Sequence, residues 1–366
     1  MKFFAERYIG MEEEEKHGKF KKVNSHTEWG NLKEVILGTA TNARVPIVKR
    51  HDIHCVDYAD YDNVVNLPGG PYPKQIIEET NEDLDIFQGQ LESIGISVIR
   101  PKTVDTNKVF ANPNWDSDGY YSYCPRDSVL VVGDTLIETP MPLRARYYET
   151  LMFKEIFKNY ARAGSKWISA PKPELSDDLY DRSNLKVPTL TEFEPCFDAA
   201  NVVKCGKDLI YLLSNSGNRF GAQWLQTTLG DRYRVHVVGG VYAFVHLDTT
   251  IMPLAPGVVL LNPKRVNENN LPNYFSNWKK IWAADPIETA YLPHWAPASP
   301  WLGMNVLSIS EKLVAVEKSQ VNLIKQLEQE GFNTLPVQLR HCRTLSGGPH
   351  CATLDTIRED HYDDFS

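Results

Sequence analysis

A recurring order of elements constrains the fold of this chain more than any single motif. Amphipathic, helix-like stretches reach a polar or glycine-bearing break and then a short apolar strand. The segments 96–100, 166–169, 234–238 and 333–337 are clear examples of such strands, and 278–282 is a poorer one. A fixed order of elements that repeats along a chain is typical of repeat architectures.

Pairs of β-branched runs joined by short turns lie between these units. The turns at 133–134, 206–207 and 256–257 join three such pairs, and a fourth pair turns near 311–312. Glycine and aspartate turns between β-branched runs are the usual signal of a β-hairpin. The repeating unit is therefore hairpin, helix, strand. We expect an α/β fold of five ββαβ repeats, a closed five-bladed propeller with helices outside and strands around a central axis.

The first 22 residues differ from the rest of the chain. They contain the acidic run 12–15 and several lysines, and they show little apolar periodicity. Such a segment is typical of a solvated, mobile extension. We expect residues 1–22 to form that extension and residues 23–366 to form one catalytic α/β domain.

Charge and composition exclude several classes of partner. The chain has 366 residues and a formal net charge of −8, whereas a nucleic-acid-binding surface would be basic. We expect no membrane span, because no run of about 18 apolar residues occurs. The six cysteines are scattered and no secretory signal precedes them, which favours reduced thiols and a cytoplasmic location. Small molecules are the expected partners.

A glycine-rich turn, 346–351, ends in His350 and Cys351. A single cysteine taken alone is more often a buried residue of the hydrophobic core than a nucleophile. A phosphate-binding thiol loop would need arginine at position 357, where Ile357 stands. A structural zinc site would need four ligands with short paired spacing, which Cys342, His350 and Cys351 do not supply, so no metal is expected.

Three further polar clusters lie in or beside the hairpins, and in a radial fold their loops would converge. Each also has a structural interpretation. Arg126 and Asp127 could form a surface ion pair, and Asp198 could cap a turn. His246 and Asp248 occupy an expected strand start, where alternation puts both side chains on one face.

Together these segments resemble the amidinotransferase family, which includes glycine amidinotransferase and inosamine-phosphate amidinotransferase. The resemblance extends from about Val23 to Asp355, and six motifs in the same order make it specific. The family fold is a five-bladed α/β-propeller shared with arginine deiminases. The six motifs are NSHTEW at 24–29, PRD at 125–127, EFEPCFDAA at 192–200, HLDTT at 246–250, WLGMNVL at 301–307 and GGPHCATLD at 347–355.

The resemblance implies a role for seven residues and requires no metal or organic cofactor. They are the nucleophile Cys351, the acid/base His246, the guanidinium-holding carboxylates Asp127 and Asp198 with Asp248 beside them, Arg265 for the substrate carboxylate, and Ser299 lining the site.

The chemistry needs these residue types. A guanidinium is planar, cationic and resonance-stabilised, so its carbon is a poor electrophile until carboxylates fix its plane. A thiolate is a strong nucleophile, although nearby carboxylates raise the pKa of its thiol. We expect the bound cation to offset that effect. The implied reaction is ping-pong: L-arginine transfers its amidino group to Cys351, ornithine leaves, and an acceptor amine takes the group.

Two other interpretations stay open at this stage. An arginine-deiminase-type hydrolase would use water in place of the amine, and a non-catalytic arginine-binding protein would have no turnover. The distinction from a hydrolase depends on how well the site excludes water and holds an amine.

The chain departs from the family pattern at several positions. Ser346 and Pro349 replace a glycine and a phenylalanine, and Asn201 replaces an aspartate. Ala243 and Val245 replace the asparagine and methionine that glycine-using relatives have before the histidine. We therefore expect an acceptor other than glycine, such as lysine or a longer amino compound of specialised metabolism. A monomer and a homodimer are both consistent with the family.

Overall fold

The computed structural model describes residues 21–47, 68–181, 183–184, 187–242, 244–289 and 291–366. All but the last two residues of the expected extension 1–22 lie outside this part of the chain, as does Ala243. No helix within the described ranges is long and apolar enough to cross a membrane.

Five three-stranded sheets in the described residues follow one pattern, in which a central strand pairs antiparallel with one neighbour and parallel with the other. Two short two-stranded sheets, β2-β3 and β5-β6, lie outside this pattern. The five sheets are β19-β1-β4 (Thr353–Glu359, Asn31–Leu37, Ser97–Ile99), β7-β8-β9 (Val129–Val132, Thr135–Glu138, Lys166–Ser169), β10-β11-β12 (Val202–Cys205, Asp208–Leu212, Arg234–Val238), β13-β14-β15 (Ile251–Ala255, Val258–Leu261, Lys279–Trp282) and β16-β17-β18 (Leu307–Ser308, Leu313–Glu317, Asn333–Val337); the two short ones are Arg44–Val45 with Gly70–Pro71 and Phe110–Ala111 with Asp116–Ser117.

Helices precede the parallel strand in four of the five units. In the fourth unit along the chain, a single 3₁₀ turn, Asn273–Phe275, precedes β15 instead. Pro272 directly precedes that turn at its N-terminal boundary. The helices of the other four units are α3 (Lys74–Ser93), α5 (Lys154–Arg162), α6 (Arg219–Leu229) and α7 (Val321–Gln329).

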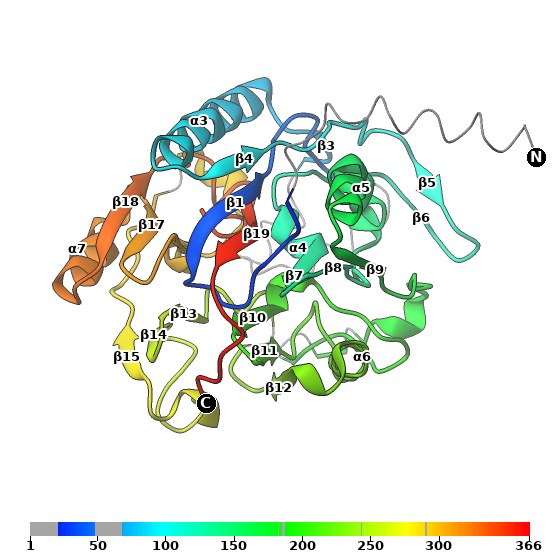
Figure 1. Ribbon diagram of the computed structural model, residues 1–366. Helices are drawn as coiled ribbons and strands as arrows, with labels where there is room; N and C mark the ends of the chain where they lie inside the picture. The colour runs from blue at the N-terminus through cyan, green and yellow to red at the C-terminus, as the bar shows by residue number, and fades with distance from the viewer. Residues whose placement is uncertain (1–20, 48–67, 182, 185–186, 243, 290) are drawn as a thin grey trace, which may run out of the picture.

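The α/β class and the repeated units are confirmed. Figure 1 shows the five sheets around a common centre, with α3, α5, α6 and α7 at the periphery. The sheets are separate and none closes on itself in the described chain, so the closed propeller stays a prediction.

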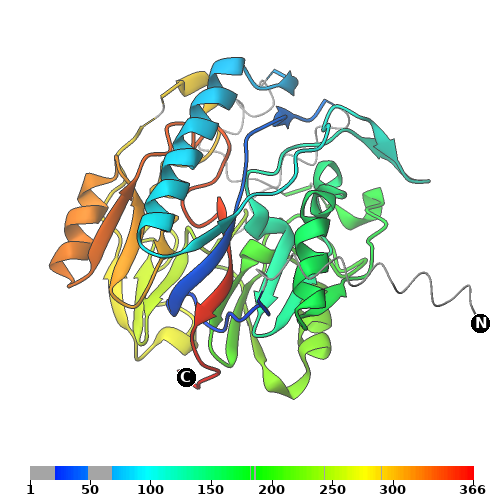
Figure 2. The ribbon, with the colours of Figure 1, turned by 45° about the horizontal axis from the view of Figure 1, so that its top comes forward.

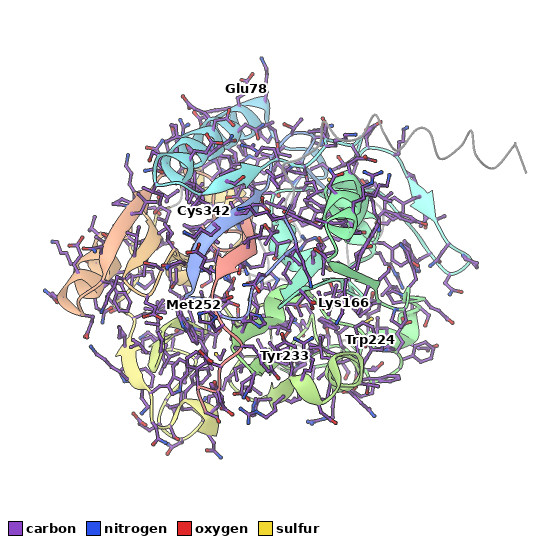
Figure 3. The ribbon with its side chains drawn as sticks, viewed as in Figure 1. Glu78, Lys166, Trp224, Tyr233, Met252 and Cys342 are labelled. Atoms are coloured by element: carbon purple, nitrogen blue, oxygen red, sulfur yellow. The ribbon has the colours of Figure 1, made fainter. Side chains whose placement is uncertain are left out.

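Side chains sort between the rim and the interior as this arrangement requires. Glu78 projects outward from α3 in Figure 3, whereas Met252 of β13 lies inside and is fully buried. Apolar side chains between neighbouring sheets supply most of the stabilising burial.

Sequence patterns did not reveal how the first sheet forms. β1 lies near the beginning of the described chain and pairs antiparallel with β19 near its end, and Figures 1 and 2 both show the two strands side by side. This pairing places the turn that contains Cys351, just before β19, among the loops of the other sheets.

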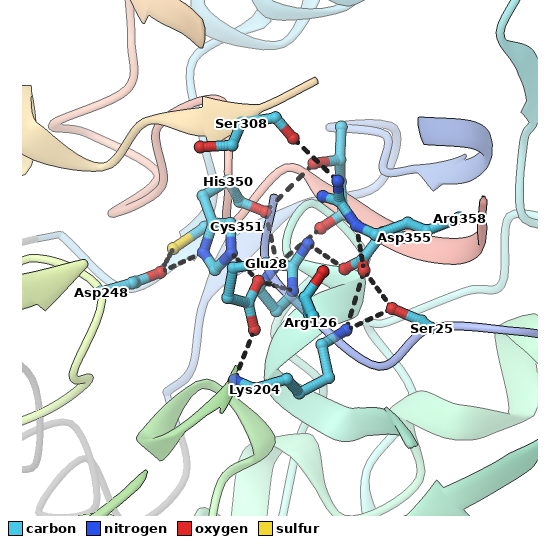
Figure 4. Close-up of polar contacts among 12 residues, drawn as sticks. Ser25, Glu28, Arg126, Lys204, Asp248, Ser308, His350, Cys351, Asp355 and Arg358 are labelled. Atoms are coloured by element: carbon cyan, nitrogen blue, oxygen red, sulfur yellow. Dashed lines mark hydrogen bonds and ion pairs between the residues drawn. The ribbon is translucent and has the colours of Figure 1, made fainter. Parts of the chain in front are cut away.

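A buried carboxylate on β19 joins segments from three sheets. Asp355 accepts hydrogen bonds from Ser25 at 2.6 Å, Arg126 at 2.7 Å, Lys204 at 2.8 Å and Arg358 at 2.8 Å (Figure 4). Burial opposes its ionisation, but Lys204, Arg358 and Arg126 hold the pKa of Asp355 well below its ordinary value. Arg126 is therefore a buried partner of Asp355, and its interpretation as a surface pair with Asp127 is wrong.

Replacing this carboxylate should cost much of the stability of the fold. Asp355→Asn leaves three buried cations without their common counter-charge, and we expect a loss of about 3–5 kcal/mol in the free energy of unfolding. Urea denaturation monitored by tryptophan fluorescence measures it. The matched control is Glu359→Gln on the same strand, which pairs with exposed Lys33 and should cost about 0–1 kcal/mol. Equal losses in both variants would contradict the role of Asp355.

Candidate active site

Polar side chains occupy equivalent places in four of the five sheets, directly before the strand that pairs antiparallel with the central strand. Asp127 lies in α4 (Pro125–Ser128) before β7, and Asp198 lies at the start of the 3₁₀ helix Ala199–Asn201 before β10. His246 and Asp248 precede β13, and Cys351 precedes β19. Because the sheets surround one centre, these five side chains meet although they are far apart in sequence.

The distances define one cluster. His246 Nε2 lies 2.9 Å from Asp198 Oδ2 and 3.9 Å from Asp127 Oδ1. Cys351 Sγ lies 3.5 Å from Asp248 Oδ2 (Figure 4), and atoms of His246, Asp248 and Cys351 lie within 4.8 Å of one another. The structure thus brings together the thiol, the imidazole and all three carboxylates that the sequence singled out.

The alternation pattern predicted His246 at the start of a strand, and this prediction is wrong. β13 begins only at Ile251, and His246 lies in the preceding loop with φ of 65°. A residue other than glycine in this left-handed region costs on the order of 1 kcal/mol, and such conformations are concentrated at functional sites. The loop geometry, not strand alternation, aims the imidazole at Asp198.

The carboxylates differ in how many of their oxygens are occupied. Asp198 accepts from the Ala200 N–H at 2.8 Å with Oδ1 and contacts His246 with Oδ2, so it both caps a turn and orients the imidazole. Asp127 Oδ2 accepts from Arg146 at 2.7 Å. The Oδ1 atoms of Asp127 and Asp248 are buried and receive no hydrogen bond from the described residues.

These contacts set the pKa values in the cluster. Burial raises the pKa of Asp127 to about 6, with His246 opposing the shift. Burial would lower the pKa of His246, but Asp198 and Asp127 outweigh it and raise that pKa well above its ordinary value. The neighbouring Cys124 thiol, burial and the charge of Asp248 raise the pKa of Cys351, so the thiol is protonated at neutral pH without a ligand.

Asp248 behaves in the opposite way. Although burial opposes its ionisation, the interaction with His350, followed by those with His246 and Arg126, lowers the pKa of Asp248 to about 2. His350 Nδ1 lies 2.7 Å from Asp248 Oδ2, and its Nε2 lies 3.2 Å from Glu28 Oε2. The residue directly before the thiol therefore fixes the carboxylate that faces it.

Several residues of this site were missed by sequence reasoning. Arg146 is buried, contacts Asp127 and forms two hydrogen bonds of 2.6 Å with Glu149. Cys124 lies beside Cys351, and Asn305 contacts the sulfur. Only Asn305 had a sequence signal, because it belongs to the WLGMNVL motif.

A cavity beside the cluster includes two of the expected residues. Ser299 lines it together with His246, and its hydroxyl also accepts a hydrogen bond from the Trp301 N–H at 3.2 Å. Arg265 adjoins the cavity: it donates to the Thr249 carbonyl at 3.1 Å and stacks 3.7 Å above the Tyr242 ring. The described residues that line the cavity are Val245, His246, Thr249, Ala298, Ser299, Leu302 and Ser346.

The glycines before the thiol are explained by close packing. A Cβ on Gly347 would lie 2.6 Å from Cys124 Sγ, and one on Gly348 would lie 2.9 Å from Asn305 Oδ1. Ser346, where the family resemblance implies glycine, has φ of 56°, a left-handed conformation that residues other than glycine adopt at a cost. The turn therefore lets the backbone approach the side chains around Cys351.

The same side chains include metal-ligand types. Three overlapping groups drawn from Cys124, Asp127, Asp198, His246, Asp248 and Cys351 have ligand atoms within 4.8 Å of one another. By type and spacing they could hold a divalent cation, and the unoccupied carboxylate oxygens equally suit a planar organic cation that donates hydrogen bonds.

Comparisons with known proteins decide the family. Inosamine-phosphate amidinotransferase 1 of Streptomyces glaucescens is 46% identical over 337 residues, covering 92% of this chain and 97% of that protein. The chain belongs to the amidinotransferase family. L-arginine:L-lysine amidinotransferase of Pseudomonas savastanoi pv. phaseolicola is 38% identical over 345 residues, covering 92% and 94% of the two chains. This amidinotransferase is thus an enzyme that transfers amidino groups. No family model matches the chain.

Solved structures agree with this assignment. Inosamine-phosphate amidinotransferase StrB1 from Streptomyces griseus superposes with a TM-score of 0.91 at 44% identity, covering 94% of this chain and 99% of that one. SxtG, an amidinotransferase from Microseira wollei in the saxitoxin biosynthetic pathway, gives 0.87 at 37% identity, covering 94% and 100%. DDAH from Pseudomonas aeruginosa gives 0.58 at 15% identity, covering 88% and 99%, a likeness of fold alone.

Proposed function

We propose that this amidinotransferase moves the amidino group of L-arginine through a covalent amidino-cysteine on Cys351 to an acceptor amine and releases L-ornithine. One observation carries the proposal: a buried thiol, an imidazole and a carboxylate meet within 4.8 Å in a member of this family. A thiol nucleophile with an acid/base imidazole is the arrangement that covalent transfer of a carbon group requires.

The unoccupied carboxylate oxygens support a guanidinium clamp. Asp127 Oδ1 and Asp248 Oδ1 accept no hydrogen bond among the described residues, and each can take an N–H of the donor. The sequence predicted Asp127 and Asp198 as the clamp. Both oxygens of Asp198 are engaged, so we assign it to holding His246 and assign the clamp to Asp127 with Asp248. Arg265, beside the cavity, is our candidate for binding the carboxylate of arginine, and Ser299 is our candidate for lining the substrate site.

The proposed cycle begins when the guanidinium cation binds. Its positive charge offsets the carboxylates, and the Cys351 thiol releases its proton to solvent. The thiolate attacks the guanidinium carbon, His246 donates its proton to the departing nitrogen, and the carbon–nitrogen bond breaks to release ornithine. The acceptor amine then attacks the amidino carbon and gives a proton to His246, and the carbon–sulfur bond breaks to regenerate the thiolate.

The acceptor proposal rests on the cavity and on the relatives. Val245 lines the cavity beside His246, at the position where glycine-using relatives have methionine, and valine is the smaller side chain. The proteins named as inosamine-phosphate and arginine:lysine amidinotransferases act on acceptors other than glycine. We propose lysine or another longer amino compound of specialised metabolism as the acceptor.

The proposal extends to the domain organisation, the location and the oligomeric state of the protein. We propose that the five sheets act as the blades of a propeller and that residues 23–366 form a single catalytic domain, with cytoplasmic location and a monomeric or dimeric state. The equivalent positions of the site residues, before the first strand of four of the five sheets, support a radial arrangement.

Removing the thiol should separate binding from turnover. Cys351→Ala is expected to lower ornithine release from arginine below detection, while arginine binding measured by calorimetry persists. In the unsubstituted protein soaked with arginine, intact mass spectrometry should detect the added mass of one amidino group. Cys205→Ala, a buried thiol on β10 away from the cluster, is the control and should keep its activity.

The products distinguish transfer from hydrolysis. With arginine as donor, glycine, lysine, 4-aminobutyrate and aminocyclitol phosphates are supplied in turn, and ornithine and citrulline are quantified. We expect amine-dependent ornithine release, with a longer amine preferred over glycine. Citrulline as the sole product would identify a hydrolase, and equal turnover of Cys351→Ala would reject the covalent route.

Arginine binding should depend on pH through Asp127. Its pKa in the free protein is raised to about 6, so below pH 6 the carboxyl holds a proton that a guanidinium must displace. In the Cys351→Ala background, we expect arginine affinity to be about tenfold lower at pH 5 than at pH 8. Asp127→Asn should bind weakly at both pH values. An unchanged pH dependence in Asp127→Asn would remove Asp127 from the clamp.

A further inference from the structure

Asn305 has the place in its sheet that the site residues have in the other four. The 3₁₀ helix Pro300–Met304 begins at Ser299, whose hydroxyl caps it, and ends at Asn305 just before β16. The same turn therefore places Ser299 on the cavity and Asn305 against the thiol. Asn305 is 1% exposed, and none of the roles assigned above uses it.

The side-chain amide of Asn305 has three contacts, all with groups of the proposed reaction centre. Its Oδ1 accepts from the Cys351 N–H at 3.0 Å, and its Nδ2 lies 3.1 Å from Cys351 Sγ and 2.7 Å from Asp248 Oδ2. A backbone N–H can only donate, so the atom facing it must be the amide oxygen, which fixes the orientation of the group. The two N–H bonds are then shared between the sulfur and the carboxylate.

We propose that Asn305 is a further catalytic residue, which donates a hydrogen bond to the Cys351 sulfur in its thiolate form and holds that sulfur beside Asp248. The proposal rests on the proposed function, because it takes Cys351 as the nucleophile.

The physical basis is a bond that strengthens with charge. A thiol sulfur is a weak acceptor, whereas a thiolate accepts a charge-assisted hydrogen bond that is roughly twice as strong. Asp248, 3.5 Å from the sulfur, disfavours the thiolate, and the Asn305 amide stands between the two anions with one N–H for each. It therefore allows the carboxylate needed for the donor to lie close to the nucleophile.

The packing around Asn305 leaves little freedom. A Cβ on Gly348 would lie 2.9 Å from Asn305 Cβ, from its carbonyl oxygen and from its Oδ1. The glycine turn thus presses against the amide, and the backbone bond to Cys351 fixes its plane. A group held this way is already ordered in the folded protein, so the reaction does not require it to reorganise.

Two substitutions separate an electrostatic role from a structural one. Asn305→Ala removes the amide, and Asn305→Asp keeps its shape and its acceptor for the Cys351 N–H but places an acceptor at the sulfur. The rate of Cys351 alkylation by iodoacetamide, followed by peptide mass spectrometry from pH 6 to pH 10, reports the thiol directly. We expect the midpoint to move to higher pH in Asn305→Ala and further still in Asn305→Asp.

Turnover should follow the same order. At neutral pH we expect kcat to fall about 10- to 100-fold in Asn305→Ala and further in Asn305→Asp, with KM for arginine changed much less. If Asn305 only fills space, Asn305→Asp should behave like the unsubstituted protein. An alkylation profile that is unchanged in both variants would overturn the proposal.

The matched control is Asn218→Ala. Asn218 is also buried, and its amide also accepts from a backbone N–H. Its Nδ2, however, lies 2.7 Å from the Thr191 carbonyl, and the residue caps α6 and has no contact with Cys351. It should lower stability without moving the alkylation profile. Because the alkylation assay needs no amidino transfer, loss of the proposed function and loss of the Asn305 role give different results.

Discussion

The position of the candidate active site depends on the buried charge cluster around Asp355. A carboxylate with no exposed surface is stable only when its hydrogen bonds and charge are compensated, and here two arginines and a lysine compensate it. Arg126 extends the cluster to the thiol turn, because it also donates to the His350 carbonyl at 2.9 Å and the Thr353 carbonyl at 3.0 Å. The groups that hold the sheets together thus hold the Cys351 turn.

The adjoining cluster around Cys351 has the opposite balance. Two of its carboxylates, Asp127 and Asp248, each keep one oxygen without a hydrogen bond among the described residues, and burial raises the pKa of Asp127 to about 6. An anionic excess in a buried site costs stability, and a bound guanidinium would relieve it. The cluster around Asp355 is internally neutralised and supports the fold, whereas the cluster around Cys351 keeps carboxylate oxygens that a bound cation would engage.

The sequence predicted local elements well because their signals are local. Glycine-containing turns located three hairpins, a polar turn near 311–312 located the fourth, and the stretch 278–282 was already a poorer copy of the unit. The pairing of β1 with β19 carried no such signal, since it joins strands from opposite ends of the chain. The same holds for Arg146, whose buried bonds to Asp127 and Glu149 depend on tertiary packing.

By itself, the sequence determined the residue types and their order: a thiol after a glycine turn, an imidazole, three carboxylates and the motifs that mark the amidinotransferase family. Only the tertiary structure decided which atoms of these side chains form hydrogen bonds and which remain available. Asp198 is engaged with His246, Asp127 and Asp248 keep an oxygen unoccupied, and Asn305 faces the sulfur. Which atoms of a side chain remain available depends on neighbours from other sheets, and spacing along one chain does not contain that information.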